Sequence, residues 1–248
     1  MPTAPAKLPI LLVHGAWHGG WSWRRVADPL RAAGHDVYTP TLTGLGERLH
    51  LARPETNLTT HINDVAGVID YEELDGFVLV GHSYGGMVIT GIADKYHDRI
   101  KALVYLDAFI PENGQSLFSI LGPEREARMQ AGARESGDGW KVKPLPSSYY
   151  RIADPNDAAH IDRMSNPHPI HCFDEKLHLT GGSAKIRHRI YIRAIGHIDG
   201  PFEPFSKKTR NQPGWTYYEV PCGHDVMLDQ PLALTGIVLE VAAKAAAA

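Results

Sequence analysis

Residues 77–96 constrain the fold of this chain more than any other segment. An apolar run at residues 77–80 leads directly into the sequence GHSYGG at residues 81–86, and helically spaced apolar residues follow as far as Tyr96. A serine in a G-x-S-x-G pattern between a buried strand and a helix is typical of a sharp turn that exposes the hydroxyl at the edge of a parallel sheet. The segment therefore predicts an α/β fold with Ser83 as a candidate nucleophile.

Strand and helix patterns alternate along the first hundred residues, as they do in a parallel sheet with helices on both faces. Strands are expected at residues 10–13, 37–38, 77–80, 102–106, 186–194 and 215–220, and helices at residues 22–33, 59–69 and 231–243, the second of these capped by Thr59 or Thr60. The alternation stops at residues 111–185, where prolines, histidines and short helical patterns predominate. We interpret the chain as one domain, residues 1–248, with a core of residues 1–110 and 186–248 and an inserted cap of about 111–185.

The charge and cysteine content exclude several classes of partner. A net charge of -3 without a Lys/Arg run argues against nucleic acid, and no segment has the roughly 18–20 continuous apolar residues of a membrane span. Cys172 and Cys222 are too few for a disulfide framework, and the apolar run after the N-terminal leader is too short for a signal segment. We expect a cytoplasmic protein with a small-molecule substrate.

A serine nucleophile needs a general base, and the base needs an orienting acid. His224 fits the base because it follows the last expected strand, which places it at the same edge of the sheet as Ser83. The oxyanion hole should use the backbone N–H of Tyr84 and a second N–H from the glycine-rich loop of residues 14–20, where Ala16 is the expected donor. The same glycines are also compatible with a tight turn that has no such role.

These motifs together resemble the α/β-hydrolase family of plant methylesterases and hydroxynitrile lyases and their bacterial esterase relatives. The resemblance rests on residues 14–23 (HGAWHGGWSW), on residues 81–86 and on the pair Gly223-His224, and it extends over nearly the whole chain. It implies an eight-stranded, mostly parallel sheet with a small helical cap, hydrolysis of esters of modest size, no cofactor and, in many members, a homodimer.

Two positions separate this chain from the lyase branch. The lyases carry a threonine where this chain has Gly15, and a lysine after the catalytic histidine where this chain has Asp225. Lyase chemistry is disfavoured because the hydroxyl that holds the cyanohydrin and the cation that stabilises departing cyanide are both missing. We expect a carboxylesterase; the alternatives are a cyanohydrin lyase and a non-catalytic small-molecule receptor on the same fold.

The family that this chain resembles usually has its triad aspartate at the position of Gly196. The acid that the resemblance implies is therefore absent from that position. Asp107 closes the strand expected at residues 102–106, and Asp199 lies in the usual loop. We favour Asp107, because a charged residue at the end of a buried strand needs a partner more urgently than one in a Gly/Pro loop, and keep Asp199 as runner-up. Asp225, next to the base, is interpreted as a capping or solvated residue.

Substrate contacts are expected from the oxyanion loop, the serine turn and the cap. The residues concerned are Gly15, Trp17, His82, Trp140 and His168. His82 has the alternative of packing against the sheet, and the aromatic residues of the cap can equally form the core of the cap itself. Prolines interrupt the spacing of His168 and His171, so we predict no metal site.

Overall fold

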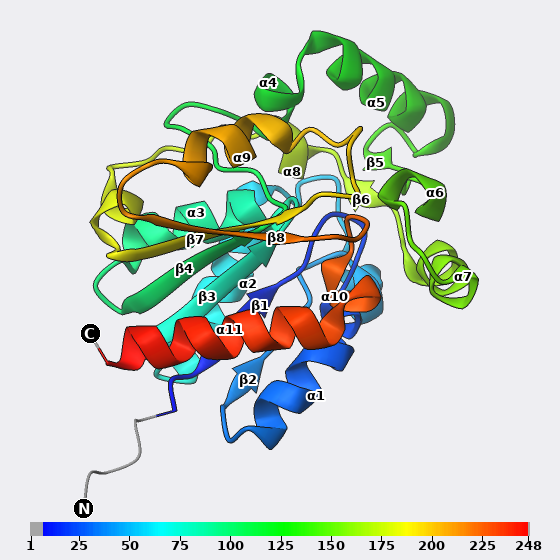
Figure 1. Cartoon of the computed structure of the whole chain (residues 1–248). Coiled ribbons are helices and arrows are strands. Elements are labelled where there is room, and N and C mark those ends of the chain that lie inside the picture. Colours follow the sequence, from blue (N-terminus) through cyan, green and yellow to red (C-terminus); the bar gives the residue numbers. More distant parts are fainter. Residues whose placement is uncertain (1–6, 248) are drawn as a thin grey trace, which may run out of the picture.

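The computed structural model describes residues 7–247, and its centre is a sheet of six parallel strands in the order β2-β1-β3-β4-β7-β8. The strands are β1 (Ile10–Val13), β2 (Val37–Tyr38), β3 (Phe77–His82), β4 (Ile100–Leu106), β7 (His188–Ala194) and β8 (Trp215–Val220). The flanking helices are α1 (Arg24–Ala32), α2 (Leu58–Tyr71), α3 (Gly85–Lys95), α9 (Glu203–Arg210), α10 (Val226–Asp229) and α11 (Pro231–Ala246). Helices α1 and α11 cover one face of the sheet, and α2, α3 and α9 cover the other (Figure 1).

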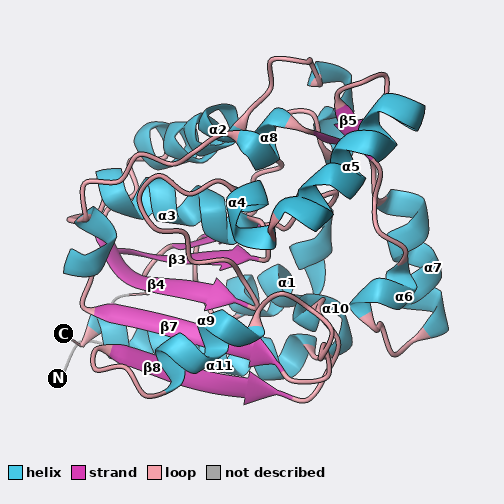
Figure 2. Ribbon diagram, turned by 90° about the horizontal axis from the view of Figure 1, so that it is seen from above, coloured by secondary structure: helices cyan, strands magenta, loops and turns pink. Residues whose placement is uncertain are grey.

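The segment between β4 and β7 carries its own small elements. They are α4 (Leu117–Leu121), α5 (Pro123–Ser136), β5 (Lys141–Val142), α6 (Ser147–Tyr150), α7 (Pro155–Met164), β6 (His168–Pro169) and α8 (His171–Asp174), and β5 pairs with β6 in a separate antiparallel sheet. We call residues 111–185 the cap segment. Its helices α5, α6 and α7 lie beyond the arrowheads of the central strands (Figure 2), so it covers the edge at which the strands end.

The α/β class is confirmed, but the central sheet has six strands in residues 7–247, where eight were expected. Residues 7–9 form no strand, and β1 already lies between two parallel neighbours, with Ile10 beside Val37 of β2 and Val78 of β3. β1 and β3 are buried along their whole length, which explains why both appear in the sequence as continuous apolar runs.

Several element boundaries differ from the sequence expectations, and β3, β4 and α11 each run two or three residues longer than expected. The helix expected at 22–33 divides into a 3-10 turn, Gly20–Trp23, and α1. Asn57, rather than Thr59 or Thr60, caps α2: its side chain accepts from the N–H of Thr60 at 2.9 Å, and Thr60 completes the capping box. The strand expected at 186–194 begins two residues later, and α9 was not expected because its sequence is mostly polar.

The register of the sheet brings distant loops together. Val13 aligns with Gly81, His82 with Leu106, and Leu106 with Ile192. The loops that follow β1, β3, β4 and β7 therefore start side by side under the cap segment, although they are far apart in sequence. Within residues 7–247, no helix is long and apolar enough to cross a membrane; the first six residues, on which the expected absence of a signal segment partly depends, lie outside the described part.

Candidate active site

Ser83 lies on a strained turn between β3 and α3. Its φ of 54° is in the left-handed region, where a residue with a side chain is uncommon. The Ser83 N–H donates to Leu106 O at 3.2 Å, and its carbonyl accepts from the N–H groups of Gly86 and Phe109. Gly86 is required by space, because a Cβ there would lie 2.1 Å from Phe109 O. The turn is therefore fixed by the strand next to it, and it holds the serine at the sheet edge.

His224 lies in the loop after β8, with its ring directed at Asp107. Its Nδ1 is 2.7 Å from Asp107 Oδ2, and its backbone N–H donates to Tyr150 O at 2.8 Å. Phe202 stacks on the imidazole at a centroid distance of 4.9 Å, and the ring of His82 lies 4.3 Å away. Since a carboxylate only accepts, the Nδ1 proton belongs to His224, and Nε2 is the ring nitrogen that can accept a proton from Ser83.

Asp107 is fully buried and is surrounded by donors. Its Oδ1 accepts from Arg193 Nη1 at 2.5 Å and from the Ala194 N–H at 3.3 Å, and its Oδ2 lies 3.3 Å from His197 Nδ1 in addition to His224. Burial by itself would raise the pKa of this carboxyl, but the hydrogen bonds from His197 and His224 and the charge of Arg193 hold the pKa well below its usual value. Asp107 is therefore a carboxylate at neutral pH.

Asp199 occupies a different environment. Its side chain is exposed and forms an ion pair with Arg151, which is itself partly exposed. Among the contacts described for residues 7–247, none joins Asp199 to His224. Of the two candidate acids, the structure brings Asp107 to the base and leaves Asp199 at the surface.

The two expected oxyanion donors face the same cavity as Ser83. Ala16, Tyr84, Ser83 and His224 all line it. Across the described chain, neither the Ala16 N–H nor the Tyr84 N–H donates to a protein acceptor. The N–H of Trp17, by contrast, is already used, since it donates to His168 Nδ1 at 3.2 Å. Ala16 and Tyr84 thus offer two N–H groups for a developing negative charge.

The cavity has a volume of about 370 Å³ and mostly apolar walls. Beside the four residues above, its lining includes Trp17, Phe109, Leu117, Leu121, Met129, Val142, Leu145, Tyr149, Tyr150 and Phe202. Most of these side chains come from the cap segment. A cavity of this size and composition suits a small organic molecule.

Four of the five expected substrate-contact residues lie outside the cavity lining; Trp17 is the exception. Gly15 packs against the serine turn, where a Cβ would lie 2.9 Å from His82 Nδ1. His82 is buried, and its Nε2 lies 3.1 Å from His224 O. Trp140 stacks under Lys141 Nζ at 4.6 Å. His168 is fully buried behind the oxyanion loop and stacks on Phe173.

Several residues around the base were not expected from the sequence. Arg193, which pairs with Asp107, is the last residue but one of β7 and is only 3% exposed. A charged residue within the buried stretch at residues 190–194 was the available signal for it. Asp225 is 0% exposed, so its interpretation as solvated is wrong: its Oδ2 lies 3.2 Å from His18 Nε2, and its side chain makes no hydrogen bond to the helix that follows. No local pattern reveals a partner so distant in sequence.

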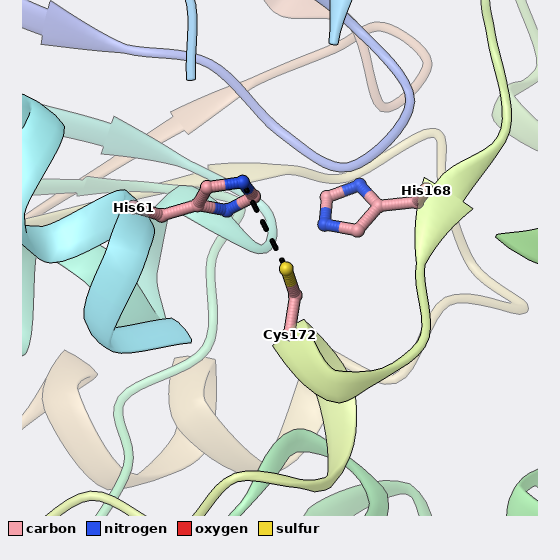
Figure 3. A group of neighbouring side chains, drawn as sticks. All are labelled: His61, His168 and Cys172. Atoms are coloured by element: carbon pink, nitrogen blue, oxygen red, sulfur yellow. Dashed lines mark hydrogen bonds between the residues drawn. The ribbon is translucent and has the colours of Figure 1, made fainter. Parts of the chain in front are cut away.

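One group of side chains outside the cavity has the residue types of a metal site. His61, His168 and Cys172 are buried, with their candidate ligand atoms within 4.8 Å of one another (Figure 3). The protonation of these side chains disfavours metal binding, however. His168 Nδ1 accepts from the Trp17 N–H, so the proton lies on Nε2, the nitrogen that would have to bind. His61 Nε2 donates to Thr43 O, and burial raises the pKa of the Cys172 thiol well above its usual value. We interpret the group as neutral packing.

Comparison with known proteins identifies the family. A model of the alpha/beta hydrolase family matches residues 10–235. The chain belongs to the alpha/beta hydrolase family. This alpha/beta hydrolase is 46% identical over 230 residues to a carbendazim hydrolyzing esterase of Nocardioides sp. (strain SG-4G), which covers 89% of this chain and 94% of the relative. It is 29% identical over 255 aligned positions to salicylic acid-binding protein 2 of Nicotiana tabacum, covering 94% and 96% of the two chains.

The solved structures agree with the family assignment. An extracellular alpha/beta-hydrolase from a Paenibacillus species superposes on this alpha/beta hydrolase with a TM-score of 0.81 at 26% identity, covering 94% of this chain and 98% of the other. The resemblance stated from the motifs alone is thereby confirmed.

Proposed function

We propose that this alpha/beta hydrolase cleaves small to medium carboxylic esters through an acyl-enzyme on Ser83. The observation that carries the proposal is the 2.7 Å contact between His224 Nδ1 and Asp107 Oδ2, beside a cavity that Ser83 and His224 both line. The relatives support the same activity, since the 46% identical protein is named an esterase.

In the proposed mechanism, Ser83 Oγ attacks the ester carbonyl while His224 Nε2 accepts the hydroxyl proton. Asp107 accepts from His224 Nδ1 and stabilises the imidazolium that forms. The N–H groups of Ala16 and Tyr84 donate to the oxyanion of the tetrahedral intermediate. Collapse of the intermediate breaks the bond to the alkoxy group, which leaves as the alcohol with the proton from His224. Water then repeats the sequence on the acyl-enzyme and releases the acid.

The residues around Ser83 oppose cyanohydrin cleavage. Gly15 has no hydroxyl, and a side chain at this position would meet His82 Nδ1 at 2.9 Å and Ser83 Cβ at 3.0 Å. The residue after His224 is a buried carboxylate, so a negative charge lies where the lyases have a cation. Cyanide release from mandelonitrile should therefore be negligible next to ester turnover.

The decisive experiment combines a Ser83→Ala variant with covalent labelling. Wild-type protein should hydrolyse p-nitrophenyl acetate and should be labelled by a fluorophosphonate at Ser83, whereas Ser83→Ala should lose both properties. A receptor would instead bind its ligand with negligible turnover. Wild-type turnover in Ser83→Ala, or a fluorophosphonate adduct on another residue, would overturn the proposal.

The location and assembly of the chain remain proposals from the sequence. We propose a single domain whose cap lies over the substrate cavity. A cytoplasmic location fits the free thiols of Cys172 and Cys222. The homodimer rests on family resemblance alone. Light scattering of the purified protein measures the assembly state, and fractionation of the producing cells measures the location.

A further inference from the structure

The peptide group between Ala16 and Trp17 is held at both of its polar atoms by histidines. The Ala16 carbonyl accepts from His18 Nδ1 at 2.7 Å, and the Trp17 N–H donates to His168 Nδ1 at 3.2 Å. Trp17 has a φ of 65°, a left-handed conformation that a tryptophan does not adopt without support. The next peptide group toward the N-terminus carries the Ala16 N–H, the proposed oxyanion donor. The orientation of that donor thus depends on the histidine contacts.

His18 is in turn held by Asp225. Its Nε2 lies 3.2 Å from Asp225 Oδ2, and both side chains are buried, with exposed fractions of 2% and 0%. A carbonyl and a carboxylate can only accept, so both ring nitrogens of His18 carry protons and the ring is an imidazolium. Burial disfavours this charge, but Asp225 raises the pKa of His18 above its usual value. The two residues form a buried ion pair 207 positions apart in sequence.

The other neighbours of the pair leave it as the main electrostatic link. Trp21 stacks on the His18 ring at 5.4 Å, and Tyr150 meets it edge-on at 5.8 Å. His82 Nε2 lies 3.7 Å from Asp225 Oδ1, but it donates to His224 O, and Asp225 Oδ1 has no hydrogen-bond partner in the described chain. His18 is therefore the group that compensates the charge of Asp225 most directly.

We propose that His18 and Asp225 are positioning residues of the oxyanion hole. Asp225 directly follows the proposed base His224, and His18 donates a hydrogen bond to the carbonyl of Ala16. The ion pair therefore ties the loop that carries the base to the loop that carries the oxyanion donor, and it keeps both at a fixed separation around Ser83. This inference rests on the proposed ester hydrolysis and adds to it two residues that do not touch the substrate.

The test compares Asp225→Asn and His18→Phe with the wild type and with Asp199→Asn, a control that removes an exposed carboxylate. His18→Phe loses both hydrogen bonds but keeps an aromatic ring against Trp21. Active sites are counted with a fluorophosphonate before kcat and KM are measured on p-nitrophenyl esters. Complete loss of one oxyanion donor costs about 10²–10³-fold in kcat, so a displaced donor should cost about 10- to 100-fold, with KM changed less than about threefold.

Two further measurements separate positioning from simple loss of structure. A trifluoromethyl ketone forms an adduct whose oxygen occupies the oxyanion hole, so its advantage over the matching methyl ketone should fall in both variants by the same factor as kcat. Ring nitrogen-15 spectra recorded over a pH series should show that both His18 nitrogens stay protonated to higher pH in the wild type than in Asp225→Asn.

The outcomes distinguish this inference from the proposed function. Unchanged kcat per titrated site in both variants, or an unchanged ketone ratio, would overturn the positioning role even if less protein folds. Activity in Ser83→Ala would instead overturn the proposed function. An inactive Ser83→Ala beside fully active Asp225→Asn and His18→Phe would leave ester hydrolysis standing and refute only the link between the loops.

Discussion

Replacing Asp107 by asparagine tests the proposed triad most directly. The carboxylate accepts from four donors, two on each oxygen: Arg193 and the Ala194 N–H on Oδ1, His197 and His224 on Oδ2. Asparagine retains one acceptor oxygen. This oxygen should accept from Arg193, because the charged guanidinium is the closest donor to Asp107, at 2.5 Å. The amide NH₂ of the new residue then faces His224 Nδ1.

This reversal changes the tautomer of the base. An NH₂ group donates, so His224 Nδ1 must accept and the ring proton moves to Nε2, where it blocks removal of the proton from Ser83. The wrong tautomer and the lost stabilisation of the imidazolium together should lower kcat by roughly 10⁴-fold, equivalent to about 5.5 kcal/mol of transition-state stabilisation. KM should change little, because Asp107 does not line the cavity.

The assay is hydrolysis of p-nitrophenyl acetate and p-nitrophenyl butyrate, with circular dichroism used to measure the folded fraction of each variant. Asp199→Asn is the matched control: its carboxylate is exposed and bound to Arg151, so we expect activity within about twofold of the wild type. The triad assignment is refuted if folded Asp107→Asn keeps more than about a tenth of the wild-type kcat, or if Asp199→Asn alone loses several orders of magnitude.

Further expectations concern stability. Arg193→Met should lower the free energy of unfolding by about 3–5 kcal/mol in urea titrations, since it leaves the buried carboxylate of Asp107 without its cation; a loss below about 1 kcal/mol would contradict this. Gly86→Ala should give little folded protein, because its Cβ would lie 2.1 Å from a backbone oxygen, whereas Gly236→Ala, with nothing within 4 Å, should stabilise α11 by about 0.5–1 kcal/mol. Folding lowers the pKa of Asp107, so the stability that this carboxylate contributes is present above the pKa of an unfolded aspartate and is lost as the pH falls. The urea midpoint of unfolding should therefore drop progressively below about pH 5. An unchanged midpoint at pH 3 would contradict this.

The serine turn could be predicted from sequence because its signal is local. Strand, glycines and helix are contiguous in the sequence, although the backbone that crowds Gly85 and Gly86 belongs to β1 and to the loops after β1 and β4. The placement of Asp107 followed from a single physical rule, that a carboxylate at the end of a buried strand needs partners. The structure supplies those partners from β7 and from the loop after it, where Arg193 and His197 lie.

The lining of the cavity could not be predicted, because it depends on where side chains of the cap segment point. Trp140 and His168 belong to a region without regular periodicity, and neither lines the cavity, whereas Tyr149 and Tyr150 do. The pairing of Asp225 with His18 was not predicted, for a related reason. The two residues meet only because the sheet brings the loops after β1 and β8 to one edge, and nothing in either local sequence records this.

Backbone strain marks the places where this edge is organised. Of the six non-glycine residues with positive φ in residues 7–247, three directly concern the site: Trp17, Ser83 and Asp107, in the loops after β1, β3 and β4. Each is held by hydrogen bonds to other segments, Trp17 by His168, Ser83 by Leu106 O and Asp107 by Ile192 O at 2.7 Å. Strained backbone of this kind persists only where the surroundings over-determine it. The requirement on the proposed triad acid is likewise geometric: it is a carboxylate oxygen at 2.7 Å from His224 Nδ1, and a residue at the end of β4 meets it in this chain. An acid in a new sequence position is therefore compatible with unchanged ester chemistry.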